Sequence, residues 1–326
     1  MNETSVLRAA VGAAVMAPST HNTQPWRFRI TGSTLDMFAD RSRQLNVIDV
    51  ARRQQIQSCG CALYNARVAV RSMGYQDETT IMLVDSDLPD HIATLHLGAA
   101  REVSRDDLEL MRAVGLRRTN RRAFLPRPVP PLVVDSLVAA ANAEGVACVR
   151  LDPGQKLVLG SLVEQADHAQ FADPAFRQEL GNWLTPFGSV RNDGIPFVEK
   201  EYGSSMPFAL MRALRSPGIG KKFGEIEEGL VLGAPVVFAF FTRGDDPPDW
   251  FAAGEALEAV LLRATTLDLS ASFLNQVLEV PQLREQVGAL VPNPGYPQMI
   301  LRLGVPAEPV AHVTPRRDID DVLERP

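Results

Sequence analysis

The segment Ala17-Pro18-Ser19-Thr20-His21-Asn22-Thr23-Gln24-Pro25-Trp26 joins an alanine-rich helical pattern, Ser5–Met16, to a strand pattern, Trp26–Ile30. Neither Pro18 nor Pro25 fits a helix interior, and each disfavours helical backbone in the residue before it. Hydroxyl, imidazole and carboxamide groups lie between the two prolines. We therefore expect a stiff turn whose hydrogen-bonding groups suit the edge of a planar, heteroatom-rich ligand.

Composition describes an ordinary globular protein. The chain has 326 residues, of which 45% are hydrophobic and 22% charged, enough for two compact domains or one large one. The net charge of −6 gives no reason to expect a nucleic-acid partner. No apolar run is long enough to cross a membrane, and the start of the chain lacks the basic region of a signal peptide. Three cysteines, an odd number, predict no disulfide framework, so we expect a cytoplasmic protein without a membrane partner.

The two halves of the chain resemble each other. Each has a helix and strand, then a long Ala/Leu-rich helix, then a strand that ends in nearly the same residues. In the first half these segments are Ser5–Met16, Trp26–Ile30, Gln55–Met73 with Gly60-Cys61-Ala62-Leu63, and Leu95-His96-Leu97-Gly98. In the second half they are Leu132–Ala141, Val146–Leu151, Trp250–Leu267 with Gly254-Glu255-Ala256-Leu257, and Leu301-Arg302-Leu303-Gly304. Apolar residues 235–241 fit a buried central strand. We place the halves at residues 1–114 and 115–326.

Each half lacks a polar segment that the other has. The turn of residues 142–145 stands where the first half has its Pro18–Trp26 loop. Before its first helix, the second half has Arg117-Arg118-Thr119-Asn120-Arg121-Arg122-Ala123-Phe124. Four arginines within six residues repel one another unless an anion lies among them, and guanidinium groups with a threonine hydroxyl suit a phosphate monoester. The alternative is a solvated basic turn.

The order Pro-Ser-x-x-Asn-x-Gln-Pro-Trp at residues 18–26, with Arg-Arg-Thr-x-Arg at residues 117–121, resembles the nitroreductase-type FMN oxidoreductases, and in particular their Acg-like group. The resemblance implies an α+β fold: a duplicated nitroreductase-like unit with two mixed sheets flanked by helices, forming a pseudo-dimer within one chain. Such proteins are normally homodimers with two flavin sites. Because each binding segment occurs once here, the resemblance implies one FMN site and a monomer or weak dimer.

The resemblance also implies which residues bind the cofactor. The isoalloxazine edge and the ribityl chain would contact Ser19, Thr20, Asn22 and Gln24. The phosphate would contact Arg118, Thr119, Arg121 and Arg316. Arg317 is the alternative to Arg316, and a frayed charged tail at residues 313–320 is the alternative to both. Arg117 and Arg122 stay open because the spacing to Phe124 is one residue longer than the commonest family form.

A further flavin-binding segment of the family corresponds to residues 271–276. It contributes Phe273, Leu274 and Asn275, although Phe273 fits a core position equally well. The family usually has a turn with proline or glycine there. Asn275 and Gln276 depart from that pattern, which leaves the hydrogen bond to flavin N5 open.

The function implied is an FMN-binding NAD(P)H oxidoreductase that passes hydride through flavin N5 to nitroaromatic or quinone-like acceptors. Flavin carries out this chemistry, so we assign no catalytic side chain. His21 either donates to flavin or substrate or packs behind them, and the histidine and cysteine spacings predict no metal site.

The segment of about residues 176–223 is rich in glycine, proline and aromatic residues, and it contains a candidate helix at residues 206–214. Long irregular insertions are commonly lids. A lid that opens fits an enzyme, and a lid that stays closed fits a non-catalytic flavin storage or sequestration protein. Two further interpretations stay open: a surface excursion that only covers core, and a structural or regulatory module that has lost flavin.

Overall fold

Two four-stranded sheets with the same strand order organise the part of the chain that the computed structural model describes, residues 2–83, 90–185, 189–196, 220–292, 295–308 and 314–324. The orders are β1-β2-β4-β3 and β5-β8-β10-β9, and every neighbouring pair is antiparallel. The first sheet contains β1 (Trp26–Thr31), β2 (Thr34–Ala39), β3 (Tyr75–Ile81) and β4 (His91–Ala100). The second contains β5 (Ala147–Arg150), β8 (Val236–Thr242), β9 (Ser270–Phe273) and β10 (Tyr296–Gly304). Single parallel bridges, Phe28 to Leu323 and Thr119 to Ala271, extend one edge of each sheet.

The sequence explains why these segments are strands. All seven residues of β8 are buried, and its valine and phenylalanine side chains suit a strand covered on both faces. In β1, by contrast, Trp26 and Phe28 are fully buried while Arg27 and Arg29 are partly exposed. That alternation is typical of a sheet with one face in the core.

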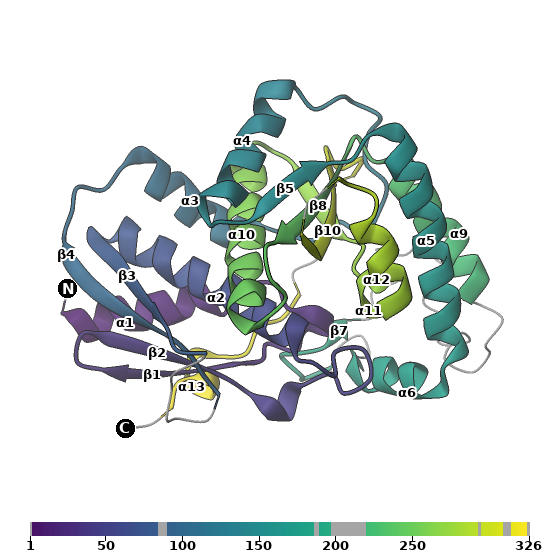
Figure 1. Cartoon of the computed structure of the whole chain (residues 1–326). Helices are drawn as coiled ribbons and strands as arrows, with labels where there is room; N and C mark the ends of the chain where they lie inside the picture. The colour runs from purple at the N-terminus through teal and green to yellow at the C-terminus, as the bar shows by residue number, and fades with distance from the viewer. Residues whose placement is uncertain are drawn as a thin grey trace.

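Two long helices, α2 (Arg53–Ser72) and α10 (Pro247–Thr266), cross between the sheets (Figure 1). Their backbones touch at two glycines. A Cβ on Gly60 would lie 2.3 Å from the carbonyl oxygen of Phe251, and one on Gly254 would lie 2.0 Å from that of Gln57. Only glycine allows so close an approach, which explains the glycine in each repeated motif.

The remaining helices cover this centre. Helix α1 (Glu3–Ala14) packs on α2, and α3 (Arg105–Leu116) contacts both α2 and α10. Helices α5 (Pro153–Ala172) and α9 (Gly220–Gly233) pack closely together, and α4 (Pro131–Ala143) lies on α10. The shorter elements are η1 (Thr20–Asn22), η2 (Arg41–Arg43), α6 (Pro174–Trp183), β6 (Leu184–Thr185), β7 (Ile195–Pro196), α11 (Gln276–Glu279), α12 (Pro281–Gly288) and α13 (Ile319–Val322). Among the helices so described, none combines the length and apolar character that a membrane span requires.

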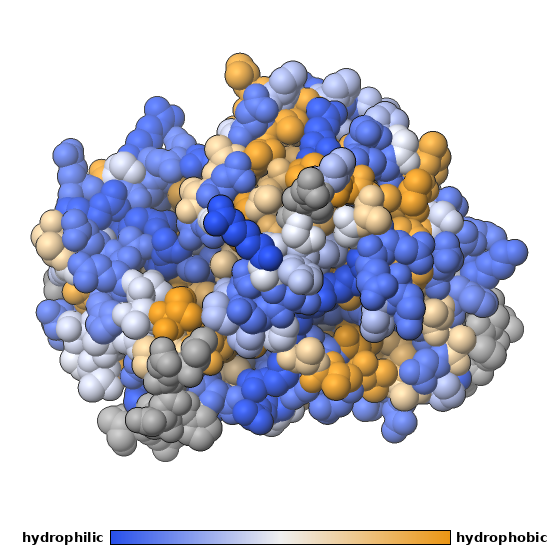
Figure 2. Space-filling view, viewed as in Figure 1, coloured by the Kyte–Doolittle hydropathy of each residue, from blue (hydrophilic) through white to orange (hydrophobic). Residues whose placement is uncertain are grey.

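The α+β fold predicted from the sequence is confirmed, but the two sheets, which we expected to be mixed, are antiparallel apart from the two single parallel bridges. The helices and strands expected in the two halves, outside the predicted insertion, are present at slightly shifted ends. The candidate helix at residues 206–214 lies outside the described residues, as do residues 186–188 and the rest of 197–219. On the face drawn in Figure 2, polar residues cover most of the surface, and apolar residues show in separate patches, over β5 and α4, at the upper right and along the lower edge.

The C-terminal segment returns to the first sheet. Glu324 accepts hydrogen bonds from Arg27 Nη1 at 2.6 Å and Arg29 Nη2 at 2.6 Å, and its backbone N–H donates to Phe28. The interpretation of this tail as frayed is therefore wrong for residues 314–324, because ion pairs and backbone hydrogen bonds fix it on β1.

We predict that Gly254→Ala lowers the free energy of unfolding by about 1–3 kcal/mol, because the added methyl group collides with the backbone of α2. The measurement is urea unfolding followed by circular dichroism. Gly229→Ala is the control, since no atom of the described residues lies within 4 Å of the would-be Cβ of this helical glycine. It should stabilise the chain by up to about 1 kcal/mol. Equal effects of the two substitutions would contradict the close crossing.

Candidate functional site

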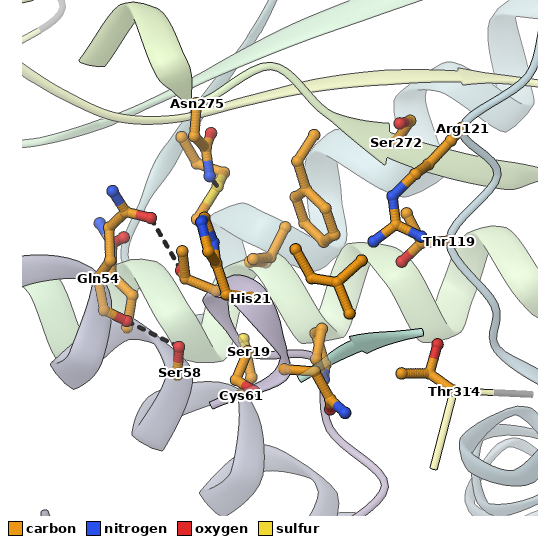
Figure 3. Close-up of a pocket in the computed structure, with 18 of the residues that line it drawn as sticks. Ser19, His21, Gln54, Ser58, Cys61, Thr119, Arg121, Ser272, Asn275 and Thr314 are labelled. Atoms are coloured by element: carbon orange, nitrogen blue, oxygen red, sulfur yellow. Dashed lines mark hydrogen bonds between the residues drawn. The ribbon is translucent and has the colours of Figure 1, made fainter. Parts of the chain in front are cut away.

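A cavity of about 320 Å³ lies where the two halves of the chain meet. Its walls come from residues 18–22, the first turns of α2, residues 117–121, helices α5 and α6, residues 272–279 and residues 314–316. Figure 3 shows Thr119 and Arg121 on one side of this space, and Gln54 and Asn275 on the other. Segments almost 300 residues apart in the chain therefore share one binding-sized volume.

The loop between α1 and β1 has an unusual backbone. The φ angles are positive at His21 (52°), Asn22 (54°) and Gln24 (48°). Side chains other than glycine adopt this region at a cost, which the surrounding contacts must offset. Such contacts are present, because Ser19 Oγ accepts a hydrogen bond from the Gln24 N–H at 2.9 Å.

Two distant segments hold the same loop. Asn22 Nδ2 donates to the carbonyl oxygens of Gly194 at 3.0 Å and Pro315 at 3.1 Å. Gln24 Nε2 donates to the carbonyl oxygen of Asn192 at 2.7 Å, and Gln24 Oε1 accepts from the Arg317 N–H at 2.8 Å. Gln24 is fully buried and is not part of the cavity wall, whereas Ser19, Thr20 and Asn22 are.

Helix α2 contributes a polar stripe that sequence reasoning missed. Gln54, Gln57, Ser58 and Cys61 line the cavity at spacings of three, four and seven residues from Gln54. That spacing places them on one face of the helix. Gln54, Gln57 and Ser58, repeated at helical spacing, were a signal that could have identified this stripe.

Hydrogen bonds join this stripe to the loop and to the second half of the chain. Thr20 Oγ1 donates to Gln54 Oε1 at 2.8 Å, and Gln54 Nε2 donates to Glu279 Oε1 at 2.8 Å (Figure 3 shows the first). Gln170 Nε2 donates to the other oxygen of Glu279 at 2.5 Å. Carboxamides and one carboxyl group thus occupy this end of the cavity.

The other end is basic. Arg117, Arg118 and Arg316 all line the cavity, and Arg117 is only 5% exposed. Among the described residues, Arg117 Nε and Nη1 and Arg316 Nε are buried without a hydrogen-bond partner. Burial, and then the nearby charge of Arg117, lowers the pKa of Arg316 to about 9. Buried cations that destabilise one another and leave donors unsatisfied form a site that an anion stabilises.

One carboxylate lies near these arginines. Glu258 is completely buried in α10, and its Oε1 lies 3.8 Å from Arg117 Nε, too far for a hydrogen bond. Burial raises the pKa of Glu258 to about 7. Glu258 therefore compensates part of the positive charge without occupying the free donors.

Arg302 fixes the shape of the arginine-rich segment. It is 1% exposed, and its guanidinium group donates to the carbonyl oxygens of Arg122 at 2.9 Å and Arg121 at 3.0 Å. The Asn120 N–H donates to Ala271, so the segment is joined to the edge of the second sheet. Thr119 and Arg121 line the cavity as a result.

The structure shows where the arginines lie whose roles the sequence left open. Arg316 lines the cavity, whereas Arg317 donates instead to the carbonyl oxygens of Gln24 and Asp321. Similarly, Arg117 lines the cavity, and Arg122 is outside its wall in an ion pair with Glu308.

Residues 273–275 also differ in whether their side chains line the cavity. Phe273 and Asn275 line the cavity, and Leu274 is fully buried in the core of the second half. The Asn275 side chain accepts from the Ile300 N–H at 3.1 Å, which fixes this departure from the family turn in place.

Three carboxyl groups that sequence reasoning missed lie around the cavity. Glu279 and Glu227 are in its wall, and burial raises the pKa of each. Asp167 stands close by, and burial and then the charge of Glu227 raise its pKa to about 8. The carboxyl groups come from α11, α9 and α5, so no local sequence pattern joins them.

The described part of the predicted insertion closes one side of the cavity. Phe176 and Leu180 of α6, with Ile195, form an apolar wall there. The remainder of the predicted lid lies outside the described residues.

Relatives in Mycobacterium tuberculosis match the chain over almost its full length. It is 32% identical over 328 residues to "Putative NAD(P)H nitroreductase Rv3131", covering 99% of this chain and 92% of the relative. The chain belongs to this NAD(P)H nitroreductase-like family. It is also 29% identical over 336 residues to "Putative NAD(P)H nitroreductase acg", covering 99% of this chain and 96% of that relative. The family resemblance noted in the loop and the arginine-rich segment is confirmed.

No model of a protein family matches the chain. Among solved structures, a nitroreductase from Bacteroides fragilis with bound FMN aligns with a TM-score of 0.40 and 17% identity, covering 64% of this nitroreductase-like chain and 94% of that structure. The NfnB nitroreductase from Mycobacterium smegmatis, in complex with NADPH, aligns with a TM-score of 0.45 and 17% identity, covering 67% and 98%.

We predict that His21 makes the protein less stable in acid. Burial and then the charge of Arg121 lower the pKa of His21 to about 4, from an ordinary 6.5. The unfolded chain therefore binds more protons between these values, and His21 costs stability as pH falls from 6.5 to 4. His21→Asn, which tolerates the left-handed backbone, should remove on the order of 2–3 kcal/mol of this loss.

Urea unfolding at pH 7 and pH 4 measures the difference. The control is His168→Asn, an exposed histidine on α5, which should retain the wild-type loss. An equal loss in wild type and His21→Asn would show that His21 is protonated in the folded state.

Proposed function

We propose that the chain is an FMN-dependent NAD(P)H oxidoreductase of the nitroreductase type, with FMN in the cavity. One observation carries this proposal: Arg117 Nε and Nη1 and Arg316 Nε, which have no hydrogen-bond partner among the described residues, meet in a cavity that the carboxamides of Asn22, Gln57 and Asn275 also line. A buried cluster of arginines suits a phosphate, and carboxamides suit the edge of a flavin ring. Membership of the NAD(P)H nitroreductase-like family supports the same function.

The residues of the cavity fit this cofactor. Arg118, Thr119, Arg121 and Arg316, joined by Arg117, would hold the phosphate and the nearby ribityl chain. Ser19, Thr20 and Asn22, with Phe273 and Asn275, would contact the ring system, together with Gln57, Ser58 and Cys61 of α2. Gln24 and Leu274 lie outside the cavity wall and would not contact FMN directly. Gln24 would fix the conformation of the loop, and Leu274 would fix the turn before Asn275.

When bound, FMN would supply hydride-transfer chemistry at its N5 between NAD(P)H and a nitroaromatic or quinone-like acceptor. The chain itself binds and orients the cofactor and keeps water from one side through α6. His21 stays neutral at pH 7, so it would offer the cofactor a neutral hydrogen-bonding imidazole and no charge.

The matching position in the other half of the chain supports a single cofactor site. Glu144 belongs to the turn that corresponds to the Pro18–Trp26 loop, and Glu255 corresponds to Cys61 by the repeated motif. Arg67 Nη1 binds both carboxylates at 2.7 Å, and Arg67 Nε binds Asp77 at 2.9 Å. Ion pairs therefore fill the place where a second site would lie, as expected of a duplicated chain with halves at about residues 1–114 and 115–326.

We predict that Arg118→Ala weakens FMN binding roughly 10- to 150-fold, since a charge-assisted hydrogen bond contributes about 1.5–3 kcal/mol. Riboflavin, which lacks the phosphate, should lose little. Titration of the flavin-free protein, followed by flavin fluorescence, gives both affinities and a stoichiometry of one FMN per chain. Arg112→Ala, an exposed arginine on α3, is the control. Equal losses for FMN and riboflavin would place Arg118 away from the phosphate, and two FMN per chain would contradict the single site.

The oxidoreductase itself is tested by anaerobic stopped-flow absorbance. Mixing the FMN-loaded protein with NADPH, and separately with NADH, should bleach the flavin absorbance within seconds, and a nitroaromatic compound should restore it. Stable FMN binding without bleaching by either nucleotide would instead favour the flavin storage protein.

A further inference from the structure

We propose that the end of the cavity opposite the arginines is the acceptor subsite, and that it selects neutral or cationic aromatic compounds over anionic ones. We define the acceptor subsite by Gln54, Gln170, Phe176, Leu180 and Glu279. The inference rests on the proposed function, because it assumes that FMN occupies the arginine end.

The shape and chemistry of the acceptor subsite suit a flat ring with a polar substituent. Phe176 and Leu180 give one apolar wall, while Gln54, Gln170 and Glu279 give a polar wall of carboxamide and carboxyl groups. An aromatic compound can bury its ring against the apolar wall and direct its substituent to the polar one.

Glu279 supplies the charge that a substituent would meet. Its two oxygens accept hydrogen bonds from Gln54 Nε2 at 2.8 Å and Gln170 Nε2 at 2.5 Å. Donors on both oxygens favour the ionised carboxylate and oppose the effect of burial. The same two amide groups are thereby committed to Glu279, which leaves fewer N–H donors for an incoming anion.

Arg53, a described cation close to Glu279, does not reach the acceptor subsite. Arg53 is 7% exposed, lies outside the cavity wall, and donates to the carbonyl oxygens of Gln298 at 3.0 Å and Leu278 at 3.0 Å. Burial lowers the pKa of Arg53 to about 10, and Arg53 remains a cation at neutral pH. It stabilises Glu279 from behind without offering a contact to a ligand.

Two further carboxyl groups lie near Glu279, but burial raises the pKa of Asp167 to about 8, so Asp167 is mostly uncharged at neutral pH. Glu227 lines the cavity with Arg121 and Arg302 nearby, so its charge is partly compensated. Asp167 is 7% exposed, and its Oδ2 has no hydrogen-bond partner among the described residues. Once the phosphate of FMN neutralises the arginine end, the described residues at this end offer an anionic acceptor the Glu279 carboxylate and amide oxygens, and no cation.

Three compounds with the same nitrobenzene ring test the selection: 4-nitrobenzyl alcohol, 4-nitrobenzoate and 4-nitrobenzylamine. Their dissociation constants are measured by calorimetry on the FMN-loaded protein without NAD(P)H, so that no turnover occurs. We expect the benzoate to bind at least about tenfold more weakly than the alcohol, and the amine at least as tightly as the alcohol.

Glu279→Gln removes the charge and should reduce the gap between alcohol and benzoate at least about fivefold. Glu285→Gln, an exposed glutamate on the neighbouring helix α12, is the matched control and should leave the gap unchanged. If Glu279→Gln does not fold, Glu227→Gln and the wild-type ratios still decide the question.

The outcomes separate this inference from the proposed function. A chain that takes up no FMN overturns both. A chain that binds FMN and is reduced by NAD(P)H, yet binds the three compounds equally, overturns only the acceptor selection. A preference for the benzoate, or a gap that Glu279→Gln leaves intact, overturns the role of the carboxylate.

Discussion

The contact between α2 and α10 at Gly60 and Gly254 sets the geometry on which the rest of the structure depends. Each glycine stands where any Cβ would meet the backbone of the other helix. The crossing fixes how the two sheets are placed around the helices. It also brings the polar stripe of α2 to the cavity that residues 117–121 and 314–316 enter from the second half of the chain. A single close approach between helices therefore decides whether one shared cavity exists at all.

The cavity combines two opposite electrostatic environments. Arginines with unsatisfied donors lie at one end, and carboxamides with carboxyl groups lie at the other. Burying these charged and polar groups without compensating contacts would destabilise the folded state at either end. Glu258 beneath the arginines and Arg53 behind Glu279 offset part of that cost, and each stands back from the space that a ligand would fill. The protein thus stabilises its charged groups without using up the atoms that a ligand needs.

Much of the fold and of the cavity wall could be predicted from the sequence, and the residues that were missed have a physical explanation. The loop at residues 18–26 and the arginine-rich segment are local patterns, so their residue types indicated their chemistry directly. The repeated glycine motif predicted the two matching helices. Gln170, Glu227 and Glu279 escaped because they come from separate helices that only tertiary packing brings together. Arg316 lines the cavity and Arg317 does not, because of the path that their segment takes beside β1. Spacing in the sequence alone does not determine that path. Gln24 showed that a polar residue in a binding motif can serve the backbone shape of the loop.

The order in which the cavity residues occur along the chain has a consequence for biosynthesis. Arg316 follows every other described residue of the cavity wall, and its segment is held by the loop before β1 and by β1, which are made near the beginning. A nascent chain that has completed both sheets still lacks one guanidinium group of the anion-binding end. Loading of the proposed cofactor would therefore be a late event in maturation, and a bound anion would stabilise the finished fold by relieving the repulsion among these arginines.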